Sequence, residues 1–423
     1  MVLTRLLAPE IFGIMLLINS LRTGTELLSD IGIGQSVVRS PNGEDRNFLD
    51  VAWTLQVLRG VLLTAFALLA AAPIAALYGQ PDLMPLILAM SPMFIFTGLQ
   101  SAGLFVSQRR MQLQRRAIYD ITSTVVGSAL AIGLALVIKS AWALVIALVV
   151  GTIISTILSF VIFERRLPRF RWEAAHVREI ISFGKWIFFS TAIYFAATSY
   201  DRLYFVAAVP IAMAGIYGVA RTFSDMLTGL AQRAGAFLVF PRAAAAHNQD
   251  GAFADRLRGT RRKTLALLAL VTGVAVAGSD QFILLAYDPR YNAAAFMIPV
   301  LMVGVWFAIL STFADAMLMG AGRPAPGAWA NLAKFAVMLV GLPFALARGS
   351  LLDALLVLVL AEAVRWLALL PASRRERFGG VRDDCLLTAL MAITALTAKW
   401  LFGTAGLAPT LGEWWAMRAL LQL

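Results

Sequence analysis

Apolar stretches of about twenty residues recur along the whole chain, and short polar loops separate them. A helix of about twenty residues crosses roughly 30 Å of hydrocarbon, because each residue adds about 1.5 Å. The pattern therefore predicts about twelve membrane-spanning helices. They are expected at residues 10–38, 50–78, 83–107, 117–138, 141–163, 183–206, 211–238, 264–286, 293–320, 327–347, 350–371 and 384–403.

Three charged residues interrupt the first apolar stretch. Arg22, Glu26 and Asp30 are four residues apart, so they share one face of the helix predicted over 10–38. A charged side chain at the bilayer centre costs about 2.5–3.5 kcal/mol even on the lenient insertion scale. This face is therefore expected to meet protein or a polar cavity, and not lipid.

The composition agrees with an all-α, polytopic membrane protein. Hydrophobic residues make up 60% of the 423 positions, charged residues only 14%, and the mean hydropathy is +0.78. The single cysteine, Cys385, excludes an intrachain disulfide. A net charge of +12 would suit nucleic-acid binding in a soluble protein, but the arginines fall in loops, so no nucleic-acid partner is expected.

The loop charges alternate from one side of the predicted helices to the other. Loops after the odd-numbered helices contain 22 arginine and lysine residues, whereas the opposite side contains four: Arg5, Lys139, Arg290 and Arg348. The positive-inside rule then places the basic loops in the cytoplasm.

The two halves of the chain are similar to each other. The segment LLAPEIFGIMLLINSLRTGTE matches VAAVPIAMAGIYGVARTFSDM, which aligns Pro9 with Pro210 and Gly13 with Gly215. Both copies run in the same direction, so the repeat is parallel. The helix at 183–206 precedes the second copy, and nothing equivalent precedes the first, so a first helix is expected to be missing.

Two segments resemble a known family. RLLAPEIFGIMLL with LLSDIGIGQSVVR, and FGKWIFFSTAIYFAATSYDRLYFVAAVPIAMAGIYGVA with its Asp201–Arg202 pair, are similar to Wzx-like polysaccharide transporters, the lipid-linked oligosaccharide flippases of the multidrug/oligosaccharidyl-lipid/polysaccharide exporter superfamily. The resemblance covers nearly the whole chain. It implies a MATE-like fold of two pseudo-symmetric helical bundles around a central cavity.

The resemblance and the pattern together predict the domain organisation. Residues 1–163 form an N-terminal bundle that lacks the first helix, and 183–371 form a C-terminal bundle. Residues 164–182 mix arginine with Phe, Leu and Trp, so they are expected to be an amphipathic connector on the cytoplasmic surface that touches anionic lipid. Residues 372–423 would add one helix and an interfacial tail containing Trp414 and Trp415.

The resemblance implies a transporter and not an enzyme. Such proteins move an oligosaccharide linked to polyprenyl diphosphate across the bacterial inner membrane, for lipopolysaccharide O-antigen, capsule or exopolysaccharide synthesis. Expected partners are the lipid-linked oligosaccharide, membrane lipids, a coupling proton or sodium ion, and polysaccharide polymerase machinery. No cofactor is expected, because no phosphate-binding GxxxxGK[ST] loop is present, and the two histidines, His176 and His247, lack a second ligand at metal spacing.

Buried arginines are the candidate contacts for the diphosphate, because a guanidinium binds phosphate oxygens in a bidentate way. The candidates are Arg22, Arg59 and Arg221. The carboxylates Glu26, Asp30 and Asp225 are candidate ion-coupling or cavity residues.

A purely structural role stays open for these charges. Arg22 with Glu26, and Arg221 with Asp225, are spaced to form ion pairs along one helix. Asp201 with Arg202 could pair locally, and Glu362 is expected to pair with Arg365. Lys334 is expected to extend toward the membrane surface.

Two other functions also fit this architecture. An ion-coupled drug or cation antiporter could use the same fold with one or two cavity carboxylates. A glycan polymerase or ligase would need a large outer loop with catalytic groups, and every predicted outer loop is shorter than about ten residues.

Overall fold

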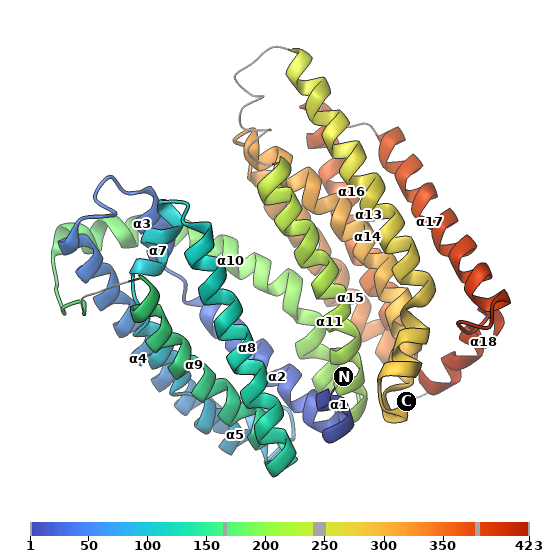
Figure 1. Cartoon of the computed structure of the whole chain (residues 1–423), viewed down its shortest axis with the longest axis horizontal. Coiled ribbons are helices and arrows are strands. Elements are labelled where there is room, and N and C mark those ends of the chain that lie inside the picture. The colour runs from blue at the N-terminus through green and yellow to red at the C-terminus, as the bar shows by residue number, and fades with distance from the viewer. Residues whose placement is uncertain (1, 164–166, 240–250, 377–380, 422–423) are drawn as a thin grey trace. The chain divides into compact units, whose positions relative to one another are not determined.

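The computed structural model describes residues 2–163, 167–239, 251–376 and 381–421. The chain forms two compact units, one of residues 14–195 and one that joins residues 3–13 to 196–423. Every secondary-structure element in the described part of the chain is a helix (Figure 1). The predicted all-α fold is confirmed, whereas the predicted domain bounds remain a prediction.

The 14–195 unit contains short helices as well as long ones. Its elements are most of α2 (Pro9–Leu28), α3 (Ile33–Arg39), α4 (Arg46–Leu77), α5 (Leu83–Met90), α6 (Met93–Gly98), α7 (Gly103–Arg109), α8 (Leu113–Ile138), α9 (Ala141–Phe163) and the first part of α10 (Ala174–Ala208). Helix α4 begins after Asp45, whose side chain accepts hydrogen bonds from the backbone N–H groups of Asn47 and Phe48.

The second unit is dominated by long helices. Its elements are α1 (Val2–Leu6), the ends of α2 and α10, α11 (Ile211–Ala234), η1 (Gly235–Val239), α13 (Gly251–Ala286), η2 (Pro289–Tyr291), α14 (Ala293–Gly320), α15 (Ala325–Ala347), α16 (Leu351–Arg375), α17 (Val381–Thr404), α18 (Leu411–Ala416) and η3 (Met417–Leu421). Helix α14 is its central element, since most of its side chains are buried.

Among the described residues, nine helices are long and apolar enough to cross a membrane, and a bent pair would make a tenth. The protein is therefore a multi-pass membrane protein. Helix α10 covers the predicted span 183–206, and α11 with η1 covers 211–238, but neither α10 nor α11 is among the nine. The total of about twelve spans thus remains a prediction.

The single helix predicted over 10–38 is wrong. Helix α2 ends at Leu28, and α3 begins at Ile33 after Gly32, which adopts a left-handed conformation with φ of 68°. The Asp30 side chain accepts a hydrogen bond from the Gly32 N–H at 2.9 Å. This local bond competes with helix continuation, so Asp30 lies in the break and not on the helix face of Arg22.

The single helix predicted over 83–107 is also wrong, because this stretch forms α5, α6 and α7. The axis bends by 56° between Leu83–Gly98 and Gly103–Arg109. Pro92 lacks a backbone N–H, and the Ser101 and Ser159 hydroxyls accept hydrogen bonds from the N–H groups of Gly103 and Ser101. Pro92 thus removes a helical donor between α5 and α6, and side chains replace helical hydrogen bonds between α6 and α7.

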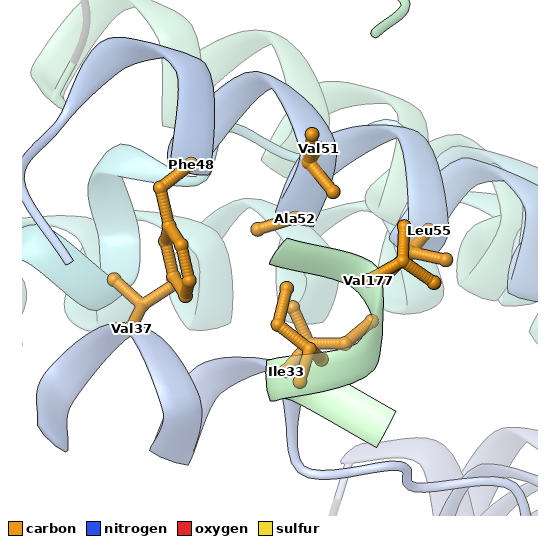
Figure 2. Packing of buried hydrophobic residues seen from close by; sticks show 8 residues of the cluster. Ile33, Val37, Phe48, Val51, Ala52, Leu55 and Val177 are labelled. Atoms are coloured by element: carbon orange, nitrogen blue, oxygen red, sulfur yellow. The ribbon is translucent and has the colours of Figure 1, made fainter. Parts of the chain in front are cut away.

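An apolar cluster joins three segments of the 14–195 unit (Figure 2). Helices α3, α4 and the start of α10 supply its buried side chains, which are Ile33, Val37, Phe48, Val51, Ala52, Leu55, Val177 and Ile180. Val177 and Ile180 belong to the segment predicted as a connector, 164–182, of which residues 164–166 lie outside the described part. The end of that segment is thus the beginning of α10, packed on α3 and α4.

Two buried ion pairs join helix α17 to helix α13 within the second unit. Arg261 of α13 binds Asp384 at 2.7 Å, and the Lys399 ammonium binds Asp280. All four side chains are nearly inaccessible. The following tail forms α18, which starts with a capping box between Thr410 and Glu413.

Candidate functional site

A polar cavity of about 640 Å³ lies within the 14–195 unit. Helices α2, α3, α4, α6 and α7 supply its walls. Its polar side chains are Thr23, Glu26, Asp30, Gln35, Arg39, Gln56, Arg59, Thr97, Gln100 and Gln108. Three of the six residues predicted for the site, Glu26, Asp30 and Arg59, therefore come together at this cavity.

Arg59 reaches from α4 to the carboxyl end of α2. Its guanidinium donates a hydrogen bond to the Glu26 carbonyl oxygen, and its Nε donates one to the Ser29 hydroxyl at 3.0 Å. The last carbonyls of a helix have no partner within the helix and carry partial negative charge. Arg59 therefore caps α2 and places positive charge in the cavity wall.

The cavity carboxylates Glu26 and Asp30 form no ion pair within the described residues. Within the described residues, no ion pair shorter than 4.0 Å joins Arg59 to Glu26 or Asp30. Asp30 instead accepts hydrogen bonds from the Gly32 N–H and, at 3.5 Å, from the Gln35 amide. The cavity thus presents guanidinium donors, carboxylate acceptors and several amides to one shared volume.

Arg22 lies apart from this group. It does not line the cavity, and the described residues contain no ion pair between Arg22 and Glu26. The structural alternative of a helical Arg22–Glu26 pair is therefore wrong in this structure. The Arg22 Nε is buried and has no hydrogen-bond partner among the described residues.

A second group of charges lies in the other unit, where α10 packs against α11. The Arg221 Nε is 3.3 Å from Asp201 and 3.7 Å from Asp225, and Arg202 binds Asp225 at 2.7 Å. The Tyr217 hydroxyl donates a hydrogen bond to Asp201, whose side chain is fully buried. The expected local Asp201–Arg202 pair is wrong, because each residue binds a partner on α11.

A neighbouring ion pair joins α15 to α16. The Lys334 ammonium binds Glu362 at 2.5 Å, and Arg365 is 3.9 Å from the same carboxylate. The predicted Glu362–Arg365 pair is confirmed. The prediction that Lys334 extends to the membrane surface is wrong: only 4% of Lys334 is exposed, because Glu362 supplies a buried counter-charge.

The sequence of this chain matches a described family. The family of polysaccharide biosynthesis proteins matches residues 2–295. The chain belongs to this family. Family membership and the membrane-spanning helices together identify a membrane protein of polysaccharide biosynthesis.

The chain is also similar to the teichuronic acid biosynthesis protein TuaB of Bacillus subtilis (strain 168). It is 21% identical over 385 residues, which cover 88% of this chain and 78% of that protein. This similarity extends beyond the matched family region into the C-terminal helices.

Solved transporters share the fold. The lipid II flippase MurJ in an inward closed conformation has a TM-score of 0.76 at 11% identity, covering 98% of this chain and 90% of its own. An inward-facing multidrug resistance MATE family transporter of the MOP superfamily has a TM-score of 0.69 at 14% identity, covering 92% and 93%. The predicted MATE-like fold is therefore confirmed.

Several residues of the cavity in this family member were not predicted from the sequence. They are Gln35, Arg39, Gln100 and Gln108. Each is a polar residue inside or at the end of an apolar stretch, and such a residue indicates a position that does not face lipid. The helix breaks brought them together, and these breaks were not predicted.

Proposed function

We propose that this protein is a flippase that moves a polyprenyl-diphosphate-linked oligosaccharide across the bacterial inner membrane by alternating access. The observation that carries the proposal is Arg59 in the wall of a polar cavity, inside a membrane-spanning unit of a polysaccharide biosynthesis protein. The product would serve O-antigen, capsule or exopolysaccharide synthesis, and the basic loops would lie in the cytoplasm.

The cavity chemistry supports this substrate class. A diphosphate needs cationic donors inside a region of low dielectric, and among the described residues the Arg59 guanidinium is held by one carbonyl and one hydroxyl. Amide side chains such as Gln35, Gln100 and Gln108 suit the hydroxyl groups of sugars, because an amide both donates and accepts hydrogen bonds.

The other predicted site residues are proposed to assist. Arg22 and Arg221 would offer further positive charge to the diphosphate. Arg221 does so from within the pairs with Asp201 and Asp225. The carboxylates Glu26, Asp30 and Asp225 would couple transport to a proton or sodium ion. Membrane lipids and polysaccharide polymerase machinery are the proposed interaction partners.

Complementation of a deletion strain tests this function. We expect the deletion to lose surface polysaccharide and to accumulate lipid-linked repeat units on the inner side. Wild-type protein should restore export, and Arg59→Ala should not. Arg116→Ala is the matched control, because Arg116 is exposed and pairs with Asp120 on the surface. Normal polysaccharide in the deletion strain would overturn the proposal.

A drug or cation antiporter is the second candidate, and the carboxylates of Glu26 and Asp30 at the cavity favour it. The same deletion strain separates the two functions. An antiporter predicts increased sensitivity to cationic drugs with unchanged lipid-linked repeat units, whereas a flippase predicts the opposite result.

A further inference from the structure

An apolar groove of about 370 Å³ lies on the other side of α6 from the polar cavity. Phe94, Thr97 and Gly98 of α6 line the cavity, whereas Phe96 and the next residue, Leu99, line the groove. At about 100° per residue, these two sets lie on opposite faces of the helix. Helix α6 is thus a partition between two compartments of different chemistry.

The groove offers no free polar group. Helix α9 and α4 supply most of the remaining lining, with Ile153, Thr156, Ile157, Phe160 and Trp53. The Thr156 hydroxyl donates to the Phe96 carbonyl at 2.8 Å, and the Trp53 Nε1 donates to the Leu99 carbonyl at 3.2 Å. Water needs polar partners in such a space, so an apolar occupant is favoured.

The groove opens sideways from a membrane-spanning helix. Ile157 of α9 is 58% exposed and Leu167 is 76% exposed, so the rim is accessible from outside. The exposed surface of α9 is apolar, and the helix is one of the candidate spans. An apolar, exposed rim on a candidate membrane span is suited to contact with lipid chains.

A basic strap, residues 167–173, closes one end of the groove. Leu167 and Pro168 line the groove directly. The backbone N–H groups of Arg169 and Arg171 donate hydrogen bonds to Asp50 and Thr54, one turn apart on α4, at 3.1 and 3.0 Å. The strap has no regular secondary structure, and these two bonds hold it against α4.

The side chains of the strap have an interfacial character. The Phe170 ring packs on Trp53 with centroids 4.9 Å apart, and Phe170 and Trp172 are 71% and 62% exposed. Arg171 is 3.7 Å from Glu173, whereas Arg169 forms no ion pair within the described residues. An exposed cation beside aromatic rings, at the end of an apolar groove, matches an anionic headgroup above a hydrocarbon chain.

We propose that the groove binds one acyl chain of an anionic phospholipid and that Arg169 contacts its headgroup. The occupant is not the isoprenoid tail of a transported lipid, because the groove shares no lining residue with the polar cavity and α6 stands between them. The bound acyl chain packs against the face of α6 that points away from the polar cavity. This site does not depend on the proposed flippase function.

Photolabelling tests the site with full-length protein in nanodiscs. The probe is phosphatidylglycerol with a diazirine at the end of one acyl chain, at trace level in phosphatidylcholine. We expect labelled peptides to contain residues of α9 or α6 at the groove. Ile157→Trp, which fills the groove, should reduce this labelling about tenfold, the equivalent of two methylene groups losing burial.

Val161→Trp is the matched control, because Val161 is 75% exposed one turn further along α9 and does not line the groove. Its labelling should equal that of the wild type. Equal labelling in Ile157→Trp and Val161→Trp would overturn the proposal, since the probe would then report only general lipid contact.

The headgroup contact is tested by competition. Unlabelled phosphatidylglycerol should compete better than phosphatidylcholine. Arg169→Gln should lower the ratio between the two lipids about fivefold. This variant keeps the backbone bond to Asp50, so the strap is retained. An unchanged preference would overturn the role of Arg169. Displacement by undecaprenyl diphosphate but not by phosphatidylglycerol would overturn the phospholipid assignment.

Discussion

Gly13 and Gly215, which occupy equivalent positions in the internal repeat, pack against each other where α2 crosses α11. A methyl group on Gly215 would overlap the Pro9 carbonyl oxygen and the Gly13 amide nitrogen, and one on Gly13 would overlap the Ile211 carbonyl oxygen. Both positions lack a side chain because each faces a backbone carbonyl oxygen of the other helix.

Gly215→Ala should destabilise the protein. The added methyl group overlaps backbone atoms that cannot rotate away, and overpacking typically costs about 1–3 kcal/mol. Thermal unfolding in detergent, followed by tryptophan fluorescence, measures the effect. Gly229→Ala on the same helix is the control, because nothing lies within 4 Å of its added methyl group. Equal melting temperatures for the two variants would contradict the proposed close packing.

Asp30→Asn separates a coupling role from a structural one. The amide oxygen can still accept the Gly32 N–H, so the break between α2 and α3 should persist and the melting temperature should change little. If Asp30 carries a coupling ion, the variant should lose the dependence of transport on the proton or sodium gradient. Asp30→Ala removes both functions and should also lower stability. An unchanged gradient dependence in Asp30→Asn would exclude Asp30 from coupling.

Lys334→Met should be strongly destabilising. It leaves Glu362 buried with the more distant Arg365 and Arg221 as counter-charges, and removal of one partner of a buried pair costs about 3–5 kcal/mol. The double variant Lys334→Met/Glu362→Gln should recover much of this loss, because neither charge is then left alone. A double-mutant cycle on the unfolding free energy measures the coupling. Additive effects would show that the two side chains do not interact.

Tyr217→Phe should weaken the α10–α11 contact. It removes the hydroxyl that donates to the buried Asp201 carboxylate, and hydrogen bonds to charged groups contribute about 1.5–3 kcal/mol. Urea or thermal unfolding should show the loss, while the ring stacking on Phe205, with centroids 4.2 Å apart, remains. Wild-type stability in this variant would mean that Arg221 alone satisfies Asp201.

Much of the fold followed from hydropathy. The predicted span 293–320 agrees with α14 at both ends, and 141–163 agrees with α9, because long apolar stretches leave a helix as the only way to satisfy the backbone in lipid. The breaks after Leu28 and Gly98 were missed. They depend on the side-chain oxygens of Asp30, Ser101 and Ser159, which accept hydrogen bonds from backbone N–H groups and which hydropathy does not measure.

The sequence by itself determined that this is a helical membrane protein with repeated halves, and it singled out the charged residues that lipid would not accept. Only the tertiary structure decided their partners: Arg59 caps α2, Lys334 meets Glu362, and Asp201 meets Arg221. The free-energy cost of placing a charged side chain in the membrane depends on that residue and its own segment, so it can be estimated from the sequence. The energy of a charge also depends on the distance to groups on other helices, and folding alone sets those distances.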